Sequence, residues 1–272
     1  MDLFETKTEE KKVLPSGAKL FLGTSGYSFP DWLKTFYPSR IRKKDWLRYY
    51  ALNFNSVEIN STYYRILSKK STAGMVSAVP DNFSFSVKLH SSMTHSRDAD
   101  KTKWEEFHRM LTPFTDSGKM GVILAQFPWS FSLEEKSFNY LAKIKENLPD
   151  MSVIAEFRHK RWYQKSVKHR VQEMGFSHAS VDLPELSGLP GRELFESSET
   201  VYCRFHGRNE KEWWGNTQMR YDYQYSDKQL SVWAEKLRNL SGKVKSCYVF
   251  FNNCHMGKAA LNAKDMEKLM EG

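Results

Sequence analysis

The chain has 272 residues, of which 40% are hydrophobic and 27% are charged. This composition is that of a globular protein with a sizeable packed core, and it excludes a disordered or fibrous chain. The formal net charge of +9 favours anionic partners, either nucleic acid or small anionic substrates.

The cysteine content indicates a reducing compartment. Cys203, Cys247 and Cys254 are odd in number and lack the spacing of metal ligands. This pattern argues against a disulfide framework and against a zinc ribbon. We therefore expect a cytoplasmic protein.

The first 18 residues are predicted to form a solvated tail in front of a single domain over residues 19–272. Acids and lysines stand where a signal peptide would need a basic start followed by an apolar run. No segment approaches the roughly 20 apolar residues that are needed to span a bilayer. No membrane partner is expected.

Short β-rich runs alternate with amphipathic segments of helix-forming composition through the rest of the chain. The predicted strands are 19–25, 55–60, 83–88, 120–127, 152–158, 177–182, 201–206 and 246–252. The predicted helices are 43–53, 69–79, 103–111, 133–148, 165–175, 227–241 and 258–271. The segment 183–200 is rich in Pro and Gly, so its helix is predicted to be weak or missing.

This alternation predicts an α/β fold with parallel strands and crossover helices. Eight repeats favour a closed (β/α)8 TIM-like barrel, and an open doubly wound sheet is the alternative. In a barrel the carboxyl ends of the strands form one rim, where active sites of this fold are built.

Almost every predicted strand ends on polar side chains, which makes this rim the candidate site. We predict Glu58, Glu156, Asp182 and His206 as catalytic residues. The predicted substrate-binding residues are Ser25, Gly26, Asn60, Lys88, His95, Gln126, Arg158, Arg204, Arg208, Asn252 and Asn253.

The period of two along a strand places Glu58 with Asn60, Glu156 with Arg158, and Arg204 with His206 on the same face. Buried charges of this kind need partners or a ligand. A purely structural ion network is one explanation, with Glu58 paired to Lys88 and Asp182 paired to Arg158 or Arg204. The additional amides and His206 would not be required by such a network, and they favour a functional site.

A set of short motifs resembles the YecE-like family, also known as domain of unknown function 72. The motifs occur in order over about residues 19–270: GTSGYSFPDW, FNSVEINSTYYRI, FSFSVK followed by MTH, LAQFP, EFRH, VYCRFHGR, YSD and YVFFNN with the later NA of Asn262 and Ala263. The resemblance implies a (β/α)8 barrel and brings no established reaction.

Several chemistries fit the strand ends. Lys88, Arg158, Arg204 and Arg208 suit a phosphate or carboxylate. Two carboxylates with nearby Trp213 and Trp214 would suit glycoside hydrolysis. His and carboxylate side chains include ligands for a divalent metal, although no HxH, HExxH or CxxC cluster is present.

We interpret the sequence as a hydrolytic or phosphoryl-type enzyme acting on an anionic substrate, which is either a phosphorylated small molecule or a nucleic acid. The sequence does not firmly imply any cofactor, and a divalent metal is a candidate. One alternative is a non-catalytic nucleic-acid or metabolite-binding module, since the aromatic segment 213–225 could stack bases or cover the site. A carbohydrate-active enzyme is the other alternative.

Overall fold

The computed structural model describes residues 12–215 and 219–271. The chain divides into two compact units, and each is described by itself. Unit 1 comprises residues 1–57, 180–186 and 191–272, and unit 2 comprises residues 58–179 and 187–190. Residues 1–11 of the predicted tail lie outside the described residues.

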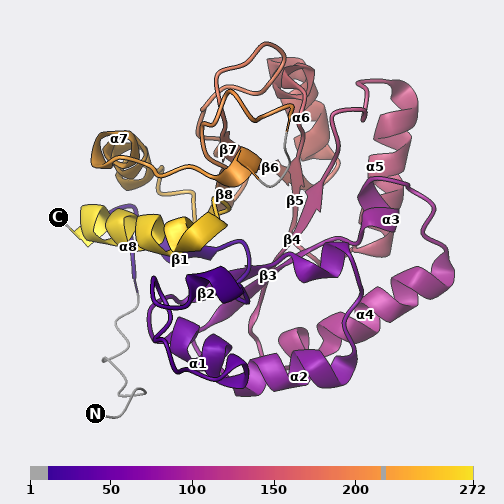
Figure 1. Ribbon diagram of the computed structural model, residues 1–272. Coiled ribbons are helices and arrows are strands. Elements are labelled where there is room, and N and C mark those ends of the chain that lie inside the picture. The colour runs from indigo at the N-terminus through magenta and orange to yellow at the C-terminus, as the bar shows by residue number, and fades with distance from the viewer. Residues whose placement is uncertain (1–11, 216–218, 272) are drawn as a thin grey trace. The chain divides into compact units, whose positions relative to one another are not determined.

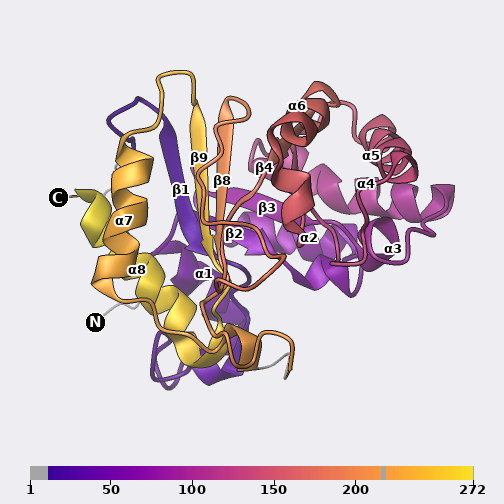
Figure 2. The same ribbon diagram turned by 90° about the horizontal axis from the view of Figure 1, so that it is seen from above.

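The strands of unit 1 form a four-stranded parallel sheet in the order β1-β9-β8-β7. Its strands are β1 (Lys19–Thr24), β7 (Ser180–Asp182), β8 (Thr200–Phe205) and β9 (Ser246–Phe251), and its helices are α1 (Trp46–Ala51), α7 (Asp227–Arg238) and α8 (Lys258–Glu271). Figure 2 shows α7 and α8 on one face of β1 and β9. Phe205 of β8 packs between Trp233 of α7 and Phe251 of β9, with ring centroids 5.2 Å and 4.5 Å apart.

The strands of unit 2 belong to a five-stranded sheet in the order β2-β3-β4-β5-β6. The strands are β2 (Ser56–Ile59), β3 (Ser84–Lys88), β4 (Met120–Gln126), β5 (Val153–Glu156) and β6 (Phe176–His178). The helices are α2 (Lys69–Ser77), α3 (Ser91–Thr94), α4 (Lys101–Asp116), α5 (Glu135–Asn147) and α6 (Lys165–Glu173). In Figure 1, α2 lies against α4.

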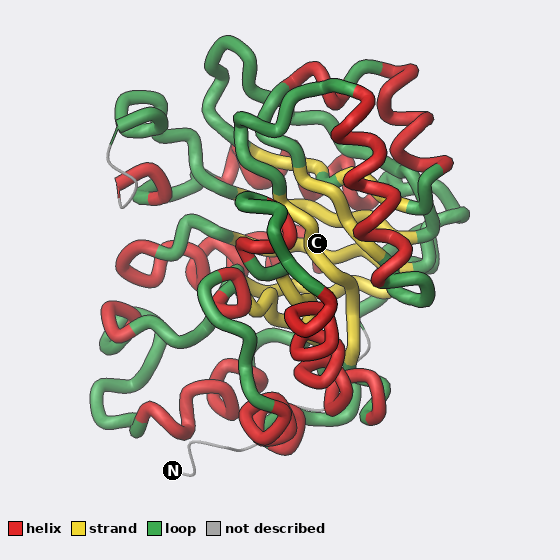
Figure 3. Tube along the Cα trace, turned by 90° about the vertical axis from the view of Figure 1, so that its right-hand side faces the viewer, coloured by secondary structure: helices red, strands yellow, loops and turns green. Residues whose placement is uncertain are grey.

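The predicted α/β class and its (β/α)8 succession of elements are confirmed. Strands follow one another in sequence order within each sheet, and the first strand pairs with the last. A doubly wound sheet would instead reverse its strand order at a switch point. Loops (green in Figure 3) join each strand to the next helix, and no helix forms between β7 and β8, as predicted.

Two predicted boundaries were wrong. The strand 177–182 is divided at Ala179 into β6 and β7, which pair in different sheets. The tail was predicted to extend to residue 18, but Leu14 is buried and Val13 forms an antiparallel bridge with Lys19. Leu14 is buried where the chain folds back onto the start of β1, so the segment from Val13 onward packs with unit 1.

Local capping explains where several helices begin. The Asp100 carboxylate accepts a hydrogen bond from the Lys103 amide at the start of α4. Ser226 and Gln229 form a capping box at the start of α7. These side chains satisfy amide groups that have no partner within the helix.

The three cysteines are free thiols. Burial raises the pKa of Cys203 to about 12, so its thiol stays protonated. No helix in the described ranges is both long enough and apolar enough to cross a membrane.

Gly23 of β1 provides a test of packing in unit 1. The Tyr50 hydroxyl accepts hydrogen bonds from the Thr24 amide and donates to the Ser56 carbonyl oxygen at 3.0 Å. A Cβ atom at Gly23 would overlap that carbonyl oxygen and lie 2.6 Å from the Tyr50 hydroxyl. We expect Gly23→Ala to lower the free energy of unfolding by about 2 kcal/mol or more, measured by urea denaturation.

Gly74 in α2 is the matched control, because a Cβ atom there meets nothing within 4 Å. Gly74→Ala should raise the free energy of unfolding by up to about 1 kcal/mol, since alanine restricts the unfolded chain. Equal losses in the two variants would contradict this account of Gly23.

Candidate functional site

The structure places the predicted site residues at the carboxyl ends of the strands in each unit. In unit 1 these are Ser25, Gly26, Asp182, Arg204, His206, Arg208, Asn252 and Asn253. In unit 2 they are Glu58, Asn60, Lys88, His95, Gln126, Glu156 and Arg158.

Lys88, the last residue of β3, is held by neighbours of unit 2. Its Nζ atom donates a hydrogen bond to Oε1 of Gln126 on β4 at 2.9 Å. The same atom lies over the ring of Tyr63, 4.5 Å from its centroid. The aromatic face and the amide oxygen both stabilise the ammonium group, so its charge has a defined position.

His95 follows the short helix α3 and packs edge-on against Tyr63, with ring centroids 4.8 Å apart. The Thr94 hydroxyl lies 3.0 Å from Nδ1 of the ring. Burial, and to a smaller extent the charges of Lys88, Arg158 and Arg97, together lower the pKa of His95 to about 4. The imidazole is therefore neutral at neutral pH. We call Lys88, His95, Arg97 and Arg158 the cationic cluster.

Glu156 and Arg158, the predicted same-face pair of β5, are joined by an ion pair of 3.2 Å. Glu156 is fully buried, and the Arg158 side chain is 13% exposed. Phe157 points the other way and stacks on Trp162, with ring centroids 4.2 Å apart. The predicted alternation of faces is thus observed here, and Glu156 orients an arginine of the cationic cluster.

The end of β2 supplies a carboxylate and an amide. Glu58 is completely buried. Asn60 caps the short turn that follows, and among the described residues its buried Oδ1 atom has no hydrogen-bond partner. An acceptor in this condition favours a ligand that donates a hydrogen bond to it.

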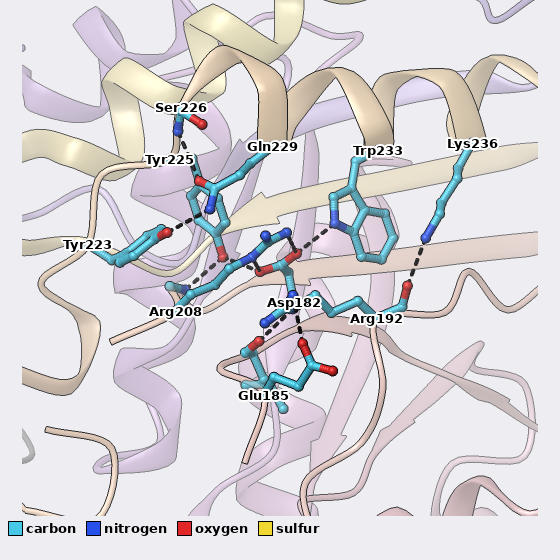
Figure 4. Close-up of polar contacts among 12 residues, drawn as sticks. Asp182, Glu185, Arg192, Arg208, Tyr223, Tyr225, Ser226, Gln229, Trp233 and Lys236 are labelled. Carbon is cyan, nitrogen blue, oxygen red and sulfur yellow. Dashed lines mark hydrogen bonds and ion pairs between the residues drawn. The ribbon is translucent and has the colours of Figure 1, made fainter. Parts of the chain in front are cut away.

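Asp182 at the end of β7 is enclosed by four donors of unit 1 (Figure 4). Arg208 donates from Nε to Oδ1 at 2.8 Å and from Nη2 to Oδ2 at 2.6 Å. The Tyr225 hydroxyl donates to Oδ1 at 2.9 Å, and the Trp233 indole donates to Oδ2 at 2.7 Å. Each carboxylate oxygen thus carries two hydrogen bonds. We call this group the Asp182 network.

The Asp182 network favours a positioning role for a residue that was predicted as catalytic. Burial and the adjacent carboxylate raise the pKa of Tyr225 well above its ordinary value, so the hydroxyl remains a donor. The same hydroxyl accepts from the Gly207 amide at 2.8 Å. The network therefore fixes the chain after β8, and it neutralises Arg208, which was predicted to bind substrate.

Arg204 and His206 of the β8 strand end form a second chain of contacts in unit 1. Nη1 of Arg204 lies 3.5 Å from Nε2 of His206, and Nη2 lies 3.5 Å from the Ser25 hydroxyl. Asn252 lies 3.0 Å from Nδ1 of His206. Both ring nitrogens are thus engaged by neighbours, an arrangement that holds the imidazole in one orientation.

Two other predicted binding residues have a local structural explanation. Gly26 has a φ of +101° and closes a tight turn in which its amide donates to the Thr24 carbonyl oxygen. Only glycine adopts this conformation readily. Asn253 donates to Asn262, which in turn binds both backbone polar groups of Tyr225. The paired asparagines of the NN and NA motifs therefore hold the segment that contains Tyr225.

No group of three or more His, Cys, Asp or Glu side chains in residues 12–215 and 219–271 is arranged to hold a metal ion. Within unit 1, Asp182 is already surrounded by donors, which compete with a metal for its oxygens.

Sequence reasoning missed several residues of these arrangements. Tyr63 and Arg97 belong to the surroundings of His95, and Tyr225 and Trp233 complete the Asp182 network. The aromatic pair directly after the predicted strand 55–60 was the available signal for Tyr63. Trp233 carried no such signal, because it lies within an amphipathic helix and resembles any core residue.

The fold and its polar strand ends define a parallel α/β protein with a (β/α)8 succession of elements. Residues 21–272 match the family described as protein of unknown function DUF72. The chain belongs to this family, as the resemblance of its motifs predicted.

The relatives include proteins from several bacteria. The chain is 28% identical to the UPF0759 protein YunF of Bacillus subtilis, over 93% of this chain and 95% of that protein. A solved DUF72 family protein of Thermotoga maritima is 38% identical with a TM-score of 0.86, covering 93% of this chain and 99% of that one. Another, from Enterococcus faecalis, is 28% identical with a TM-score of 0.82, covering 93% and 96%.

The Asp182 network predicts a large effect of a small substitution. In Asp182→Asn one acceptor oxygen becomes an amide nitrogen, which cannot accept from the donors that face it. We expect a loss of about 3 kcal/mol in the free energy of unfolding, because the Arg208 charge and another donor lose their partner. Chemical denaturation measures this loss.

Glu185→Gln is the control in the same unit. The Glu185 side chain is 87% exposed and lies 3.7 Å from Arg192, so its removal should change the free energy of unfolding by no more than about 0.5 kcal/mol. A loss in Asp182→Asn as small as this would show that the network does not stabilise the fold.

The lowered pKa of His95 predicts a pH dependence of stability. Between its folded pKa of about 4 and its ordinary value of 6.5, only the unfolded chain binds this proton. The contribution of neutral His95 to the free energy of unfolding is therefore fully present above pH 6.5, and it is lost as the pH falls toward about 4.

The variant His95→Gln should show a shallower decrease in stability over that pH range, measured by urea denaturation at a series of pH values. Part of the decrease should persist, because burial also lowers the pKa of His178 to about 4. A decrease as steep as that of the wild type would contradict the prediction.

Proposed function

We propose that this protein binds a phosphorylated substrate at the carboxyl ends of β3, β4 and β5 and hydrolyses it. The observation that carries the proposal is a neutral imidazole, His95, in the field of Lys88, Arg97 and Arg158. Burial is the largest cause of the lowered pKa of His95, and the three neighbouring cations, which are the smaller cause, would also attract an anion. Lysine and arginine side chains are the groups that bind phosphate most often.

The geometry favours a division of roles within the cationic cluster. Lys88 and Arg158 are oriented by Gln126 and Glu156, and we assign to them the phosphate oxygens. The Nδ1 atom of His95 is engaged by the Thr94 hydroxyl, so we assign proton transfer in the reaction to the other ring nitrogen, Nε2. Bound phosphate would offset the surrounding positive charges and raise the pKa of His95 toward the range of an effective general base.

The proposed step is the hydrolysis of a phosphate ester. A water molecule gives a proton to Nε2 of His95 while its oxygen forms a bond to phosphorus. The bond between phosphorus and the ester oxygen breaks, and the departing alkoxide takes a proton from solvent. His95, predicted from sequence as a binding residue, is thus assigned a catalytic role, while Glu156 and Asp182 become positioning residues.

Glu58 of unit 2 remains a predicted acid–base group for this site, His206 remains a separate prediction in unit 1, and a divalent metal remains a candidate cofactor. A small anionic molecule and a nucleic acid remain the candidate partners, and the cytoplasm the proposed location.

The proposal is tested by binding inorganic phosphate and by hydrolysis of p-nitrophenyl phosphate, with divalent metals added and chelated. Lys88→Met should weaken phosphate binding about tenfold or more, because a charge-assisted hydrogen bond is lost. His95→Ala should lower turnover far more than it lowers affinity.

Lys101→Met is the matched control, since the Lys101 side chain is 91% exposed on α4. It should bind phosphate as the wild type does, and circular dichroism should show that all three variants are folded. Phosphate binding that is equally weak in wild type and Lys88→Met at low salt would refute the site. Binding without turnover under any metal condition would instead support the non-catalytic binding module.

A further inference from the structure

Tyr64 is the most exposed of the large apolar side chains in the described residues, at 81%. It follows the turn Ser61–Tyr63 at the end of β2. A large aromatic ring that is left in water gains no burial energy for the fold, so it is available to a ligand.

The ring of Tyr64 contacts Tyr63, the aromatic side chain that borders the cationic cluster. Its centroid is 4.9 Å from that of Tyr63, and the two rings are nearly perpendicular. Tyr63 in turn lies under Lys88 and against His95. The exposed ring is therefore separated from the proposed phosphate position by one aromatic side chain.

The backbone beneath Tyr64 is held in place. The Thr62 hydroxyl lies 2.6 Å from the carbonyl oxygen of Lys88 and 2.8 Å from that of Ile59. The Tyr64 amide donates to the Ser61 carbonyl oxygen. The turn that presents the exposed ring is thus tied to the strand end that presents Lys88.

An exposed aromatic ring near a cluster of cations suits a ligand that has both an aromatic group and an anionic group. A nucleoside phosphate carries an anionic group and a flat aromatic base, joined by a sugar that can cross the width of one side chain. Bases stack on exposed aromatic rings. The buried Oδ1 atom of Asn60, which has no partner among the described residues, offers an acceptor to a hydroxyl or amino group of such a ligand.

We propose that the substrate of the cationic cluster is a nucleoside phosphate whose base stacks on Tyr64. This inference rests on the proposed function, because it places the phosphate at Lys88 and Arg158. The same chemistry is found in a free nucleotide and in the terminal nucleotide of a single strand.

The test compares the affinities of three probes: inorganic phosphate, ribose phosphate and adenosine monophosphate. In the wild type, adenosine monophosphate should bind more tightly than ribose phosphate. Tyr64→Ala should weaken adenosine monophosphate binding about tenfold and leave the two other affinities unchanged, since a stacked base contributes about 1–3 kcal/mol. Tyr64→Phe, which keeps the ring, should retain the affinity of the wild type.

Failure of this inference is distinguishable from failure of the proposed function. If phosphate binds and depends on Lys88, but Tyr64→Ala binds adenosine monophosphate as the wild type does, the stacking site is refuted and the phosphate site stands. If none of the three probes binds to the wild type, the proposed function itself fails.

A second comparison distinguishes the two sources of the ligand. An oligodeoxyadenylate with a terminal phosphate should bind more tightly than the mononucleotide if the natural ligand is a strand, and Tyr64→Ala should weaken its binding as well. If the mononucleotide binds as tightly as the oligonucleotide, the site belongs to a free nucleotide. Oligonucleotide binding that is unaffected by Tyr64→Ala would refute the role of this ring.

Discussion

A charge that is buried at the end of a strand must either be matched by hydrogen bonds or be neutralised by a change in protonation, because an isolated ion in a protein interior costs several kcal/mol. Both outcomes are found in this chain. The carboxylate of Asp182 is matched by four hydrogen-bond donors. His95 gives its charge up, since burial and three neighbouring cations lower its pKa to about 4. The Asp182 network holds the chain after β8 in place through Tyr225, and the neutral His95 is the group to which the proposed function assigns a response to an anion.

The sequence predicted the succession of elements well, because each strand and helix is set by local periodicity and composition. It also predicted that Glu156 and Arg158 share a face, since side chains alternate along a strand. It predicted the partner of Asp182 wrongly: the ion pair is with Arg208, which follows β8. The division of 177–182 at Ala179 was beyond sequence reasoning, because pairing in different sheets depends on neighbours that are distant in the chain.

Aromatic side chains have two different uses in this protein, and composition alone does not separate them. Tyr225 and Trp233 are buried, and each directs its polar atom at Asp182, so their rings fill the core while their donors satisfy a charge. Tyr63 and Tyr64 lie at the end of β2, where one ring supports Lys88 and the other is exposed. The distinction depends on what surrounds each ring, which only the structure shows.

In the proposed function, anion binding at the cationic cluster and protonation of His95 would be mutually dependent. The positive charges that favour a phosphate are the ones that disfavour a proton on the imidazole. An anion that offsets these charges must therefore raise the pKa of His95, and protonation of His95 must strengthen anion binding by the same free energy. A site of this kind would have its base neutral before the substrate arrives and more basic once the phosphate is bound. Through this coupling, His95 would become a stronger base only while the phosphorylated substrate is bound.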